Sequence, residues 1–386
     1  MRLDVRVMIC GGDGFCGWPT ALYLSRQGHD VAIVDSLVRR QWDGELGTQS
    51  LLPIASPEAR LAAWRTRTGH DIRLHIGDMT DADFLYGVLR TERPQGIVHF
   101  AEQRSAPYSM LDRAHAVFTQ VNNVVGTLNL LYGIKEVVPD CHLVKLGTMG
   151  EYGTPDIDIE EGYIEIHHKG RSDVLPFPKQ PGSMYHLSKV HDSHNLDFAC
   201  RVWGLAATDL HQGVVYGVQT EETALEPALW NRFDTDAVFG TVLNRFVAET
   251  AAGQPLTVYG EGGQTRGFIQ IADTVRCVEL ALLHPARPGR LRVFNQFTEQ
   301  FSVMDLARRV AAVAGEMGVG TGLTSLPNPR VEQERHHYRA AHTELVALGL
   351  RPHLLDDALI RDLLCLARRF SDRIVTDKLL PEVHWR

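Results

Sequence analysis

The sequence predicts a doubly wound α/β fold, a parallel β-sheet covered by helices on both faces, with a smaller C-terminal domain. Three observations predict it. Short β-branched runs alternate with helix-length stretches from residue 5 to residue 212, a rhythm that is typical of βαβ units. A glycine-rich turn joins the first run to the first helix. The chain has 386 residues, which is enough for such a unit and a second domain.

Each element follows from its local pattern. Strands are expected where short apolar runs stand between polar turns, at 5–10, 31–35, 72–78, 96–102, 142–148 and 206–217. Helices are expected at 14–27, 82–91, 117–133 and 185–203. A long connection follows residue 35. Apolar and polar residues alternate around Lys169 and Gly170, which predicts a hairpin inserted just before the last of these helices.

The alternation of strands and helices breaks beyond residue 212. We therefore expect one domain over 1–212 and a second over 213–386, with more than one chain segment crossing between them. In the second part an amphipathic helix is expected around 303–314. Such a domain would pack over the carboxyl ends of the strands, where ligands bind in open α/β sheets.

Composition limits the class of partner. The formal charge is −8, and a net acidic chain is a poor general binder of nucleic acid or of an anionic membrane. No apolar run reaches the length of a membrane span, and charges interrupt the N-terminal run before a signal sequence forms. The six cysteines contain no C-x-x-C pair and are expected to be buried thiols. These features favour a cytoplasmic protein with a pocket for a small molecule.

A dinucleotide motif stands at the start of the chain. Gly11, Gly14 and Gly17 form G-x-x-G-x-x-G at the mouth of the first helix, where glycines allow a tight turn and close approach to a pyrophosphate. Asp35 ends the next strand, where a carboxylate would accept hydrogen bonds from an adenosine ribose and repel a 2′-phosphate. The first domain is therefore expected to be a Rossmann domain that binds NAD.

Three further residues bear on the cofactor. Arg39 and Arg40 follow Asp35 closely enough to leave NADP open as the alternative, and Arg39 is a candidate cofactor contact. Asp78 ends the third strand, where this fold often contacts adenine. A helix N-cap is the other interpretation of Asp78.

A second motif carries the chemistry. Tyr185 and Lys189 are four residues apart, so a helix places phenol and ammonium on one face. A nearby cation favours phenolate, which predicts that Tyr185 becomes a general base near neutral pH while Lys189 also holds a ribose. Thr148 ends the preceding strand, where its hydroxyl would share a substrate oxygen with Tyr185. These residues predict hydride transfer rather than a non-catalytic dinucleotide-binding scaffold.

Long segments carry a family resemblance, among them FAEQRSAPYS, KLGTMGEYGTP, YHLSK and GGQTRGF. The chain resembles the extended short-chain dehydrogenase/reductases that act on nucleotide sugars, and is similar to the UDP-sulfoquinovose synthase family almost from end to end. The resemblance implies UDP-glucose and sulfite as substrates and a tightly held NAD that is recycled within each turnover. It also implies a homodimer formed through a helix bundle.

The implied reaction has two chemical requirements. Oxidation at C4 makes a ketone that acidifies the C5 proton, and loss of the C6 hydroxyl leaves a 5,6-ene to which sulfite adds. Return of hydride to C4 closes the cycle. The protein thus needs an acid/base at O4 and a separate one at C5 and C6.

The second acid/base is not the usual one. Sugar-nucleotide 4,6-dehydratases carry Asp-Glu directly after the Thr, whereas this chain has Met149 and Gly150. His186 matches the family's histidine after the Tyr, and an imidazole titrates near neutrality, so His186 is the candidate for proton transfer at C5 and C6. Glu151 and Glu102 are weaker candidates.

The remaining candidates concern substrate binding. Arg104 follows the end of the fourth strand, where a cation could meet sulfite or sugar hydroxyls, although a structural salt bridge is an alternative. Guanidinium groups suit phosphate oxygens, and Arg266 and Arg330 match positions at which the extended family clamps UDP. The other residues expected in this site are Gln103, Glu151 and Asn244.

Two alternatives stay open. A metal site built on His186, His191 and His194 is disfavoured, because no carboxylate or cysteine spacing completes a ligand set. The rival function is an NAD-dependent dehydratase that omits sulfite and releases an exocyclic 5,6-ene sugar nucleotide or nucleoside. It is kept because the sequence departs from the family pattern at four positions in or near the substrate domain: His211, Gln270, Ala272 and Arg339.

Overall fold

The computed structural model describes residues 5–330 and 337–385. Its centre is a seven-stranded sheet in which every pairing is parallel, and this confirms the doubly wound fold. The strand order is β12-β8-β5-β4-β1-β2-β3. The strands are β1 (Arg6–Cys10), β2 (Asp30–Asp35), β3 (Ile72–Ile76), β4 (Gly96–His99), β5 (His142–Thr148), β8 (Ala206–Gln212) and β12 (Arg292–Gln296).

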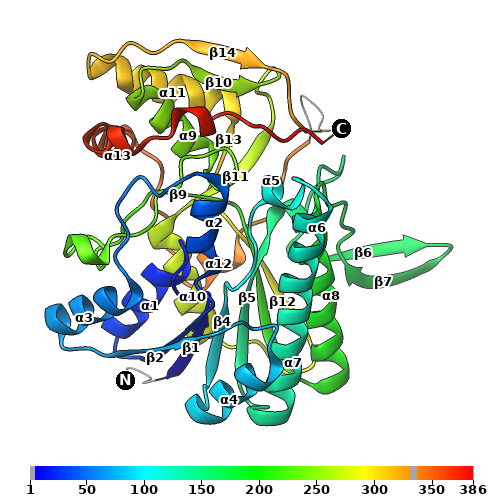
Figure 1. The fold of residues 1–386 in the computed structure, drawn as a ribbon. Helices are drawn as coiled ribbons and strands as arrows, with labels where there is room; N and C mark the ends of the chain where they lie inside the picture. The colour runs from blue at the N-terminus through cyan, green and yellow to red at the C-terminus, as the bar shows by residue number, and fades with distance from the viewer. Residues whose placement is uncertain (1–4, 331–336, 386) are drawn as a thin grey trace.

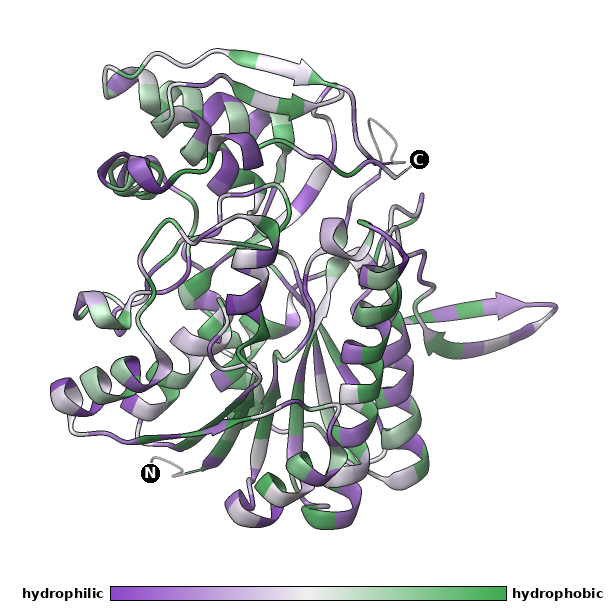
Figure 2. Cartoon of the chain, in the orientation of Figure 1, coloured by the Kyte–Doolittle hydropathy of each residue, from purple (hydrophilic) through white to green (hydrophobic). Residues whose placement is uncertain are grey.

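Helices cover both faces of this sheet (Figure 1). On one face lie α1 (Gly17–Arg26), α3 (Pro57–Thr68) and α10 (Ile271–Leu283), and on the other lie α4 (Ala82–Glu92), α7 (Gly126–Val137) and α8 (Met184–Trp203). Figure 2 shows hydrophobic residues concentrated on the central strands, as expected when a parallel sheet is buried on both sides. The carboxyl ends of the strands are therefore the edge left for a site.

Three details differ from the sequence expectation. The long connection after β2 contains α2 (Val38–Leu46) and α3, the latter capped by Ser56, whose hydroxyl accepts from the Ala59 N–H at 3.2 Å. The helix expected at 117–133 is a longer, continuous element made of α6 (Arg113–Gln120), the π-helical turn η1 (Val121–Val125) and α7. The last helix begins at Met184 because Ser183 caps it.

The second lobe lies above the carboxyl ends of the strands (Figure 1). Its helices are α9 (Val242–Ala251), α11 (Val303–Glu316) and α13 (Asp357–Arg369). Its strands are β9 (Val214–Tyr216), β11 (Thr265–Gln270) and β13 (Glu299–Ser302) in one sheet, and β10 (Leu256–Tyr259) with β14 (Leu323–Leu326) in another. Since α10 and β12 return to the large sheet, this lobe consists of separate stretches of chain. The division at residue 212 stays a prediction.

The expected hairpin is present as β6 (Tyr163–His168) and β7 (Arg171–Pro176). Lys169 and Gly170 form its turn with φ of 49° and 77°, a left-handed pair that suits a two-residue hairpin. The hairpin projects away from α8 (Figure 1). The short elements are α5 (Ala106–Ser109), α12 (Glu344–Ala347), η2 (Met149–Glu151), η3 (Pro227–Leu229), η4 (Ser371–Arg373) and η5 (Thr376–Lys378). Among the described residues, no helix is long and apolar enough to cross a membrane.

Candidate active site

The glycine turn after β1 is packed too tightly for side chains. Gly11 has φ of 81°, and a Cβ there would lie 2.6 Å from the Ala101 nitrogen. A Cβ at Gly17 would lie 2.1 Å from the Gly11 carbonyl oxygen, and one at Gly14 would lie 3.2 Å from that same oxygen. The turn therefore brings the N-terminus of α1 close to the ends of β1 and β4. Such a helix end attracts phosphate through its N–H groups and dipole.

A long pocket of about 1080 Å³, partly open to solvent, begins at this turn. One end is lined by Gly14, Asp35 and Asp78, and the other by Tyr185 and Lys189. A dinucleotide with its adenosine at Asp35 would fit this lining. Its pyrophosphate would meet the glycine backbone at the helix N-terminus, and its other end would lie near Tyr185 and Lys189. The residues present thus suit the predicted NAD.

The Asp35 carboxylate is held in place by backbone groups. It accepts hydrogen bonds from the N–H groups of Asp13 at 2.9 Å and Leu37 at 2.7 Å. Burial raises the pKa of Asp35 to about 6, against the lowering effect of those two N–H groups. Asp35 is therefore ionised at neutral pH and can accept from ribose hydroxyls.

The two arginines after β2 are already paired with carboxylates. Arg40 donates to both oxygens of Asp13, at 2.6 and 2.9 Å. Arg39 lines the pocket, but it donates to Asp43 at 2.5 Å and to Asp234 at 3.0 Å. A 2′-phosphate would have to compete with these partners, which weakens the NADP alternative.

Asp78 lines the adenosine end of the pocket. Its carboxylate accepts from the N–H and the hydroxyl of Thr80, both at 2.8 Å. The cap of α4 is Asp81, which accepts from the Phe84 N–H at 3.1 Å. The helix-cap interpretation of Asp78 is therefore wrong, and an adenine contact stays the prediction for it.

Tyr185 and Lys189 line the other end of the pocket together with Gly147, the residue before Thr148. Thr148 ends β5, and its hydroxyl oxygen accepts from the Gly150 N–H at 3.2 Å. Tyr185 lies in the first turn of α8, where its N–H donates to the Ser109 hydroxyl at 3.0 Å. The Lys189 ammonium is 5.8 Å from the centre of the Tyr185 ring. The structure thus gathers the tyrosine and the lysine as the helix spacing predicts.

The electrostatics around Tyr185 differ from the expectation. Lys189 is ion-paired with Glu102 and also donates to the Leu146 carbonyl at 2.5 Å. Burial, and next the Glu102 carboxylate, raise the pKa of the Tyr185 phenol, and the charge of Lys145 only partly offsets this. The expectation that Lys189 lowers this pKa is wrong for the structure as it stands, because Glu102 occupies the ammonium.

His186 also departs from the expected titration. Burial, and next the nearby charges of Arg330 and Arg266, lower the pKa of its imidazole to about 3. The expectation of titration near neutrality is therefore wrong, and the ring is neutral at pH 7. The ring lies 5.1 Å from that of Tyr185. It also fills the space above Gly150, where a Cβ would be 2.4 Å from Nε2.

That contact explains the Met149-Gly150 pair. A side chain at position 150 and the imidazole of His186 cannot occupy the same space. With His186 in this place, position 150 has room for glycine but not for the acidic side chain that the ordinary dehydratases carry.

Glu151 lies behind Thr148 rather than in the pocket wall. Its carboxylate is fully buried, pairs with the Lys179 ammonium at 2.5 Å and accepts from the Ser193 hydroxyl at 2.7 Å. It also accepts from the Thr148 N–H at 3.2 Å. Glu151 is therefore placed to hold the end of β5, and a direct contact with substrate stays only a prediction.

The other substrate candidates have protein partners. Arg104 lines the pocket and pairs with Asp234 at 2.7 Å, as in the salt-bridge alternative. Gln103 is buried and donates to the Ser105 carbonyl at 2.9 Å. Asn244 is buried as well and donates to the Asp234 carbonyl at 3.1 Å. Gln103 and Asn244 thus stabilise loops around the site.

Sequence reasoning missed a buried charge cluster beneath Tyr185. Lys145 on β5 and Asp209 on β8 are fully buried and 4.0 Å apart, and Asp192 on α8 is fully buried too. Glu151, Asp209 and His211 are close enough together to hold a metal ion. Because lysines already face two of these carboxylates, the cluster does not favour a divalent cation. The sequence signal for this cluster was the presence of charged residues, Lys145 and Asp209, inside the apolar runs of β5 and β8.

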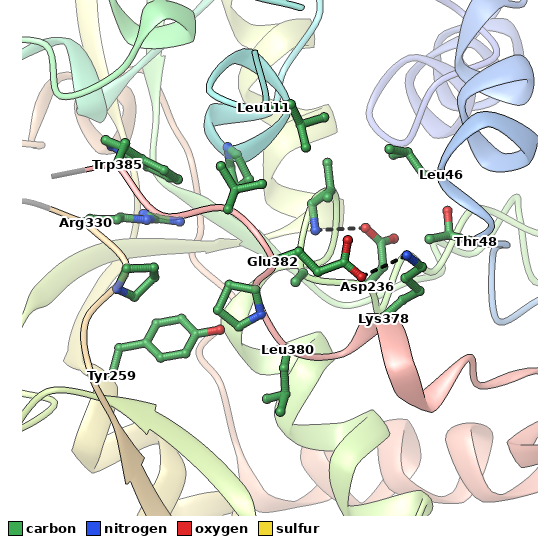
Figure 3. A pocket seen from close by; sticks show the side chains of 16 residues that line it. Leu46, Thr48, Leu111, Asp236, Tyr259, Arg330, Lys378, Leu380, Glu382 and Trp385 are labelled. Carbon is green, nitrogen blue, oxygen red and sulfur yellow. Dashed lines mark hydrogen bonds and ion pairs between the residues drawn. The ribbon is translucent and has the colours of Figure 1, made fainter.

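A second pocket, of about 580 Å³, lies on the Arg330 side (Figure 3). Arg330 and Tyr259 are on its wall, and Trp385 lies over Arg330, with 5.3 Å between the guanidinium carbon and the ring centre. Arg266 and Arg330 both act on the pKa of His186, which places the two predicted phosphate ligands on the same side of the site. No sequence motif had singled out Trp385.

Known proteins resemble the chain over most of its length. The model of the NAD dependent epimerase/dehydratase family matches residues 7–295. The chloroplastic UDP-sulfoquinovose synthase of Spinacia oleracea is 59% identical over 99% of this chain and 79% of that protein. The UDP-sulfoquinovose synthase of Sulfolobus acidocaldarius is 43% identical over 99% of this chain and 98% of that protein.

A solved structure shows the same fold. The UDP-glucose 4-epimerase of Stenotrophomonas maltophila, with bound NAD and formylated UDP-arabinopyranose, superposes with a TM-score of 0.72 at 19% identity. The match covers 96% of this chain and 100% of that one. At this identity the likeness concerns the fold alone.

Proposed function

The chain belongs to the NAD dependent epimerase/dehydratase family, and we propose that it converts UDP-glucose and sulfite to UDP-sulfoquinovose. The observation that carries the proposal is identity of 59% and 43%, over nearly the whole chain, with two relatives that bear the name of this activity. The His186 ring above Gly150 supports it, because this arrangement supplies an acid/base without the Asp-Glu pair.

Bound NAD supplies the hydride acceptor for C4 of the sugar and, later in the same turnover, the hydride donor. The glycine turn would hold its pyrophosphate, and Asp35 would accept from its adenosine ribose. Tyr185 takes the proton of the 4-hydroxyl and returns it at the end, while Thr148 hydrogen-bonds the same oxygen. A buried phenol with a raised pKa suits the return step, and the charge of Lys145 favours the phenolate that the first step needs.

We assign the second proton transfer to His186. A neutral imidazole can accept the C5 proton, and the imidazolium so formed is a strong acid because the pKa of the buried ring is low. It can therefore pass that proton to the departing C6 hydroxyl, which leaves as water. Hydrogensulfite then adds at C6 through its sulfur, C5 takes up a proton from solvent, and the proton of the hydrogensulfite is released to solvent. Atoms balance, since one water is lost and one sulfite gained.

The dehydratase alternative finds little support around the pockets. Of the four departures from the family pattern, His211 is buried and hydrogen-bonded to the Tyr152 hydroxyl at 2.7 Å. Gln270 occupies the N-cap position of α10, and Ala272 follows in the first turn of that helix. Arg339 has a side chain that is 80% exposed. None of the four lines either of the two pockets described above.

We also propose a homodimer in the cytoplasm. The helical stretch from α6 to α7 and the end of α8 expose large apolar side chains of the kind that form a helix-bundle interface: Val117, Val121, Val125, Tyr132, Phe198 and Val202. Sedimentation velocity should give the mass of two chains. Replacement of Val121 and Phe198 by Glu should then give monomers.

Mass spectrometry of the product tests the proposed activity. Wild-type protein with UDP-glucose and sulfite should yield a nucleotide sugar in which a sulfonate replaces the C6 hydroxyl. Without sulfite this product should be absent. A water-loss product that forms equally with and without sulfite would favour the dehydratase instead, and an unchanged mass with inverted C4 would indicate a 4-epimerase.

A further inference from the structure

The segment that follows α13 contacts the loop after α2 and lines the pocket beside Arg330. Arg373 donates to the carbonyls of Ser50 at 3.0 Å and Leu51 at 2.9 Å, which fixes the segment to the loop after α2. The Ala237 N–H then donates to the Lys378 carbonyl at 2.8 Å. In Figure 1 this segment is red and extends from the second lobe toward α5. Residues 378–385 are called the C-terminal strap below.

Trp385 ends the strap with contacts to two separate parts of the site. Its backbone N–H donates to the Pro329 carbonyl at 2.9 Å, beside Arg330. Its indole N–H donates to the Gly182 carbonyl at 3.1 Å, directly before the Ser183 cap of α8. The ring itself faces the Arg330 guanidinium at 5.3 Å (Figure 3). One side chain thus joins the start of the catalytic helix to a predicted phosphate ligand.

We propose that Trp385 is a positioning residue, which sets the distance between Arg330 and the first turn of α8. The inference rests on the proposed function, in which Arg330 holds the diphosphate and α8 presents Tyr185 and His186 to the sugar. These groups act on opposite ends of one substrate, and the chain supplies them from different lobes. Their relative position must therefore be fixed by tertiary contacts.

The strap also forms part of the wall of the pocket beside Arg330. Leu380, Glu382 and Val383 line it together with Tyr259. Lys378 donates to Glu382 at 2.9 Å, so the two charges of the strap neutralise each other (Figure 3). Arg330 also lines this pocket, and a guanidinium group suits the phosphates of a nucleoside diphosphate.

The two contacts of Trp385 predict separable effects. A displacement of about 1 Å can cost about 10²-fold in rate when reacting groups lose alignment. Loss of the indole N–H should misalign α8 and lower kcat. Loss of the ring should also release Arg330 and weaken binding of the diphosphate.

The test uses the full-length holoenzyme and three variants. Trp385→Phe keeps a ring over Arg330 and removes the N–H, Trp385→Ala removes both, and His384→Ala alters the exposed neighbour on the same strap. The readouts are kcat with UDP-glucose and sulfite, reduction of bound NAD on adding UDP-glucose, and the Kd of UDP by calorimetry. Thermal unfolding controls for folding.

We expect Trp385→Phe to lower kcat about tenfold or more while the Kd of UDP stays within twofold. Trp385→Ala should show that loss and also raise the Kd of UDP several-fold, and His384→Ala should match the wild type. A wild-type kcat in Trp385→Phe, or an equal loss in His384→Ala, would overturn the inference. If no sulfonated product forms with any protein, the proposed function fails, while UDP affinity and NAD reduction still decide the role of Trp385.

Discussion

One wall of the site contains the glycine turn and comes from the first βα units; it is called the cofactor wall. The opposite wall, called the substrate wall, carries Arg266 and Arg330 and comes from segments far apart in the chain. On the first wall, Gly11 and Gly17 lie on either side of one turn, and Asp35 ends the neighbouring strand. On the second, Arg266 lies in β11 and Arg330 follows β14, where it contacts Trp385. The first wall depends on local geometry, and the second on the packing of two lobes.

The comparison predicts how mutations act. Changes in the cofactor wall should alter NAD binding alone, and changes in the substrate wall should alter affinity for the sugar nucleotide. Changes at Tyr185 and His186, which lie where the two walls meet, should lower the rate of the chemical steps and leave both NAD and the sugar nucleotide bound.

The largest effect is expected for Tyr185→Phe. The variant lacks the proton acceptor for the 4-hydroxyl, so the rate should fall by at least the 10²- to 10⁴-fold that a general base typically contributes. Bound NAD, measured after denaturation of the purified protein, should stay at the wild-type level. Tyr86→Phe on the surface of α4 is the matched control. Loss of NAD from Tyr185→Phe would place the residue on the cofactor wall instead.

His186→Ala should separate the two halves of the reaction. Reduction of bound NAD by UDP-glucose should persist, seen as absorbance of NADH, while hydrogen exchange at C5 falls by about 10²- to 10⁴-fold. Gly150→Ala should act in the same direction, since its Cβ would need the space of the imidazole. His191→Ala, exposed on the same helix, is the control. Unchanged exchange at C5 in His186→Ala would move this role to another group.

Arg266→Ala and Arg330→Ala should raise the KM for UDP-glucose and spare NAD. Each removes charge-assisted hydrogen bonds worth about 1.5 to 3 kcal/mol, or roughly 10- to 100-fold in affinity. Arg308→Ala on α11, where the side chain is 70% exposed, should have no effect. If both site variants behave like this control, the substrate carries no diphosphate. An unphosphorylated nucleoside would then be the better candidate.

The smallest effect concerns Asp35 and pH. Because burial raises the pKa of Asp35 to about 6, this carboxyl takes up a proton as the pH falls from 7 to 5 and loses an acceptor for the ribose. The affinity for NAD should therefore fall a few-fold over that range and return above pH 7. Titration calorimetry with apoprotein measures it. Asp35→Asn should bind weakly with no such slope, and an equal slope in this variant would implicate another group.

The fold and the cofactor wall could be predicted from sequence because both depend on short-range patterns. The glycine spacing, the strand ending in Asp35 and the helical spacing of Tyr185 and Lys189 each act within one element or one turn. The partners of Arg39 could not be predicted as readily, because Asp234 is 195 residues away from it along the chain. That pairing weakens the NADP alternative, because a 2′-phosphate would have to compete with Asp234 for Arg39.

The titration of the site could not be predicted for a related reason. A spacing of four residues places Lys189 near Tyr185, but it does not reveal that Glu102 takes the ammonium. Likewise, the identity of His186 suggests a pKa near neutrality, whereas its burial beside Arg266 and Arg330 lowers that pKa to about 3. Burial and long-range charges exist only in the folded chain. Trp385 was missed because its contacts, to Gly182 and Pro329, are also long-range.

In the proposed reaction one chain oxidises C4, eliminates across C5 and C6, adds sulfite and reduces C4 again with the same hydride. The most direct test is turnover of UDP-glucose and sulfite in deuterated water, with no nicotinamide added beyond what the protein holds. Product UDP-sulfoquinovose should carry one deuterium at C5 and none at C4, as read by proton NMR and mass spectrometry. Deuterium at C4, or a product with hydrogen retained at C5, would contradict the account.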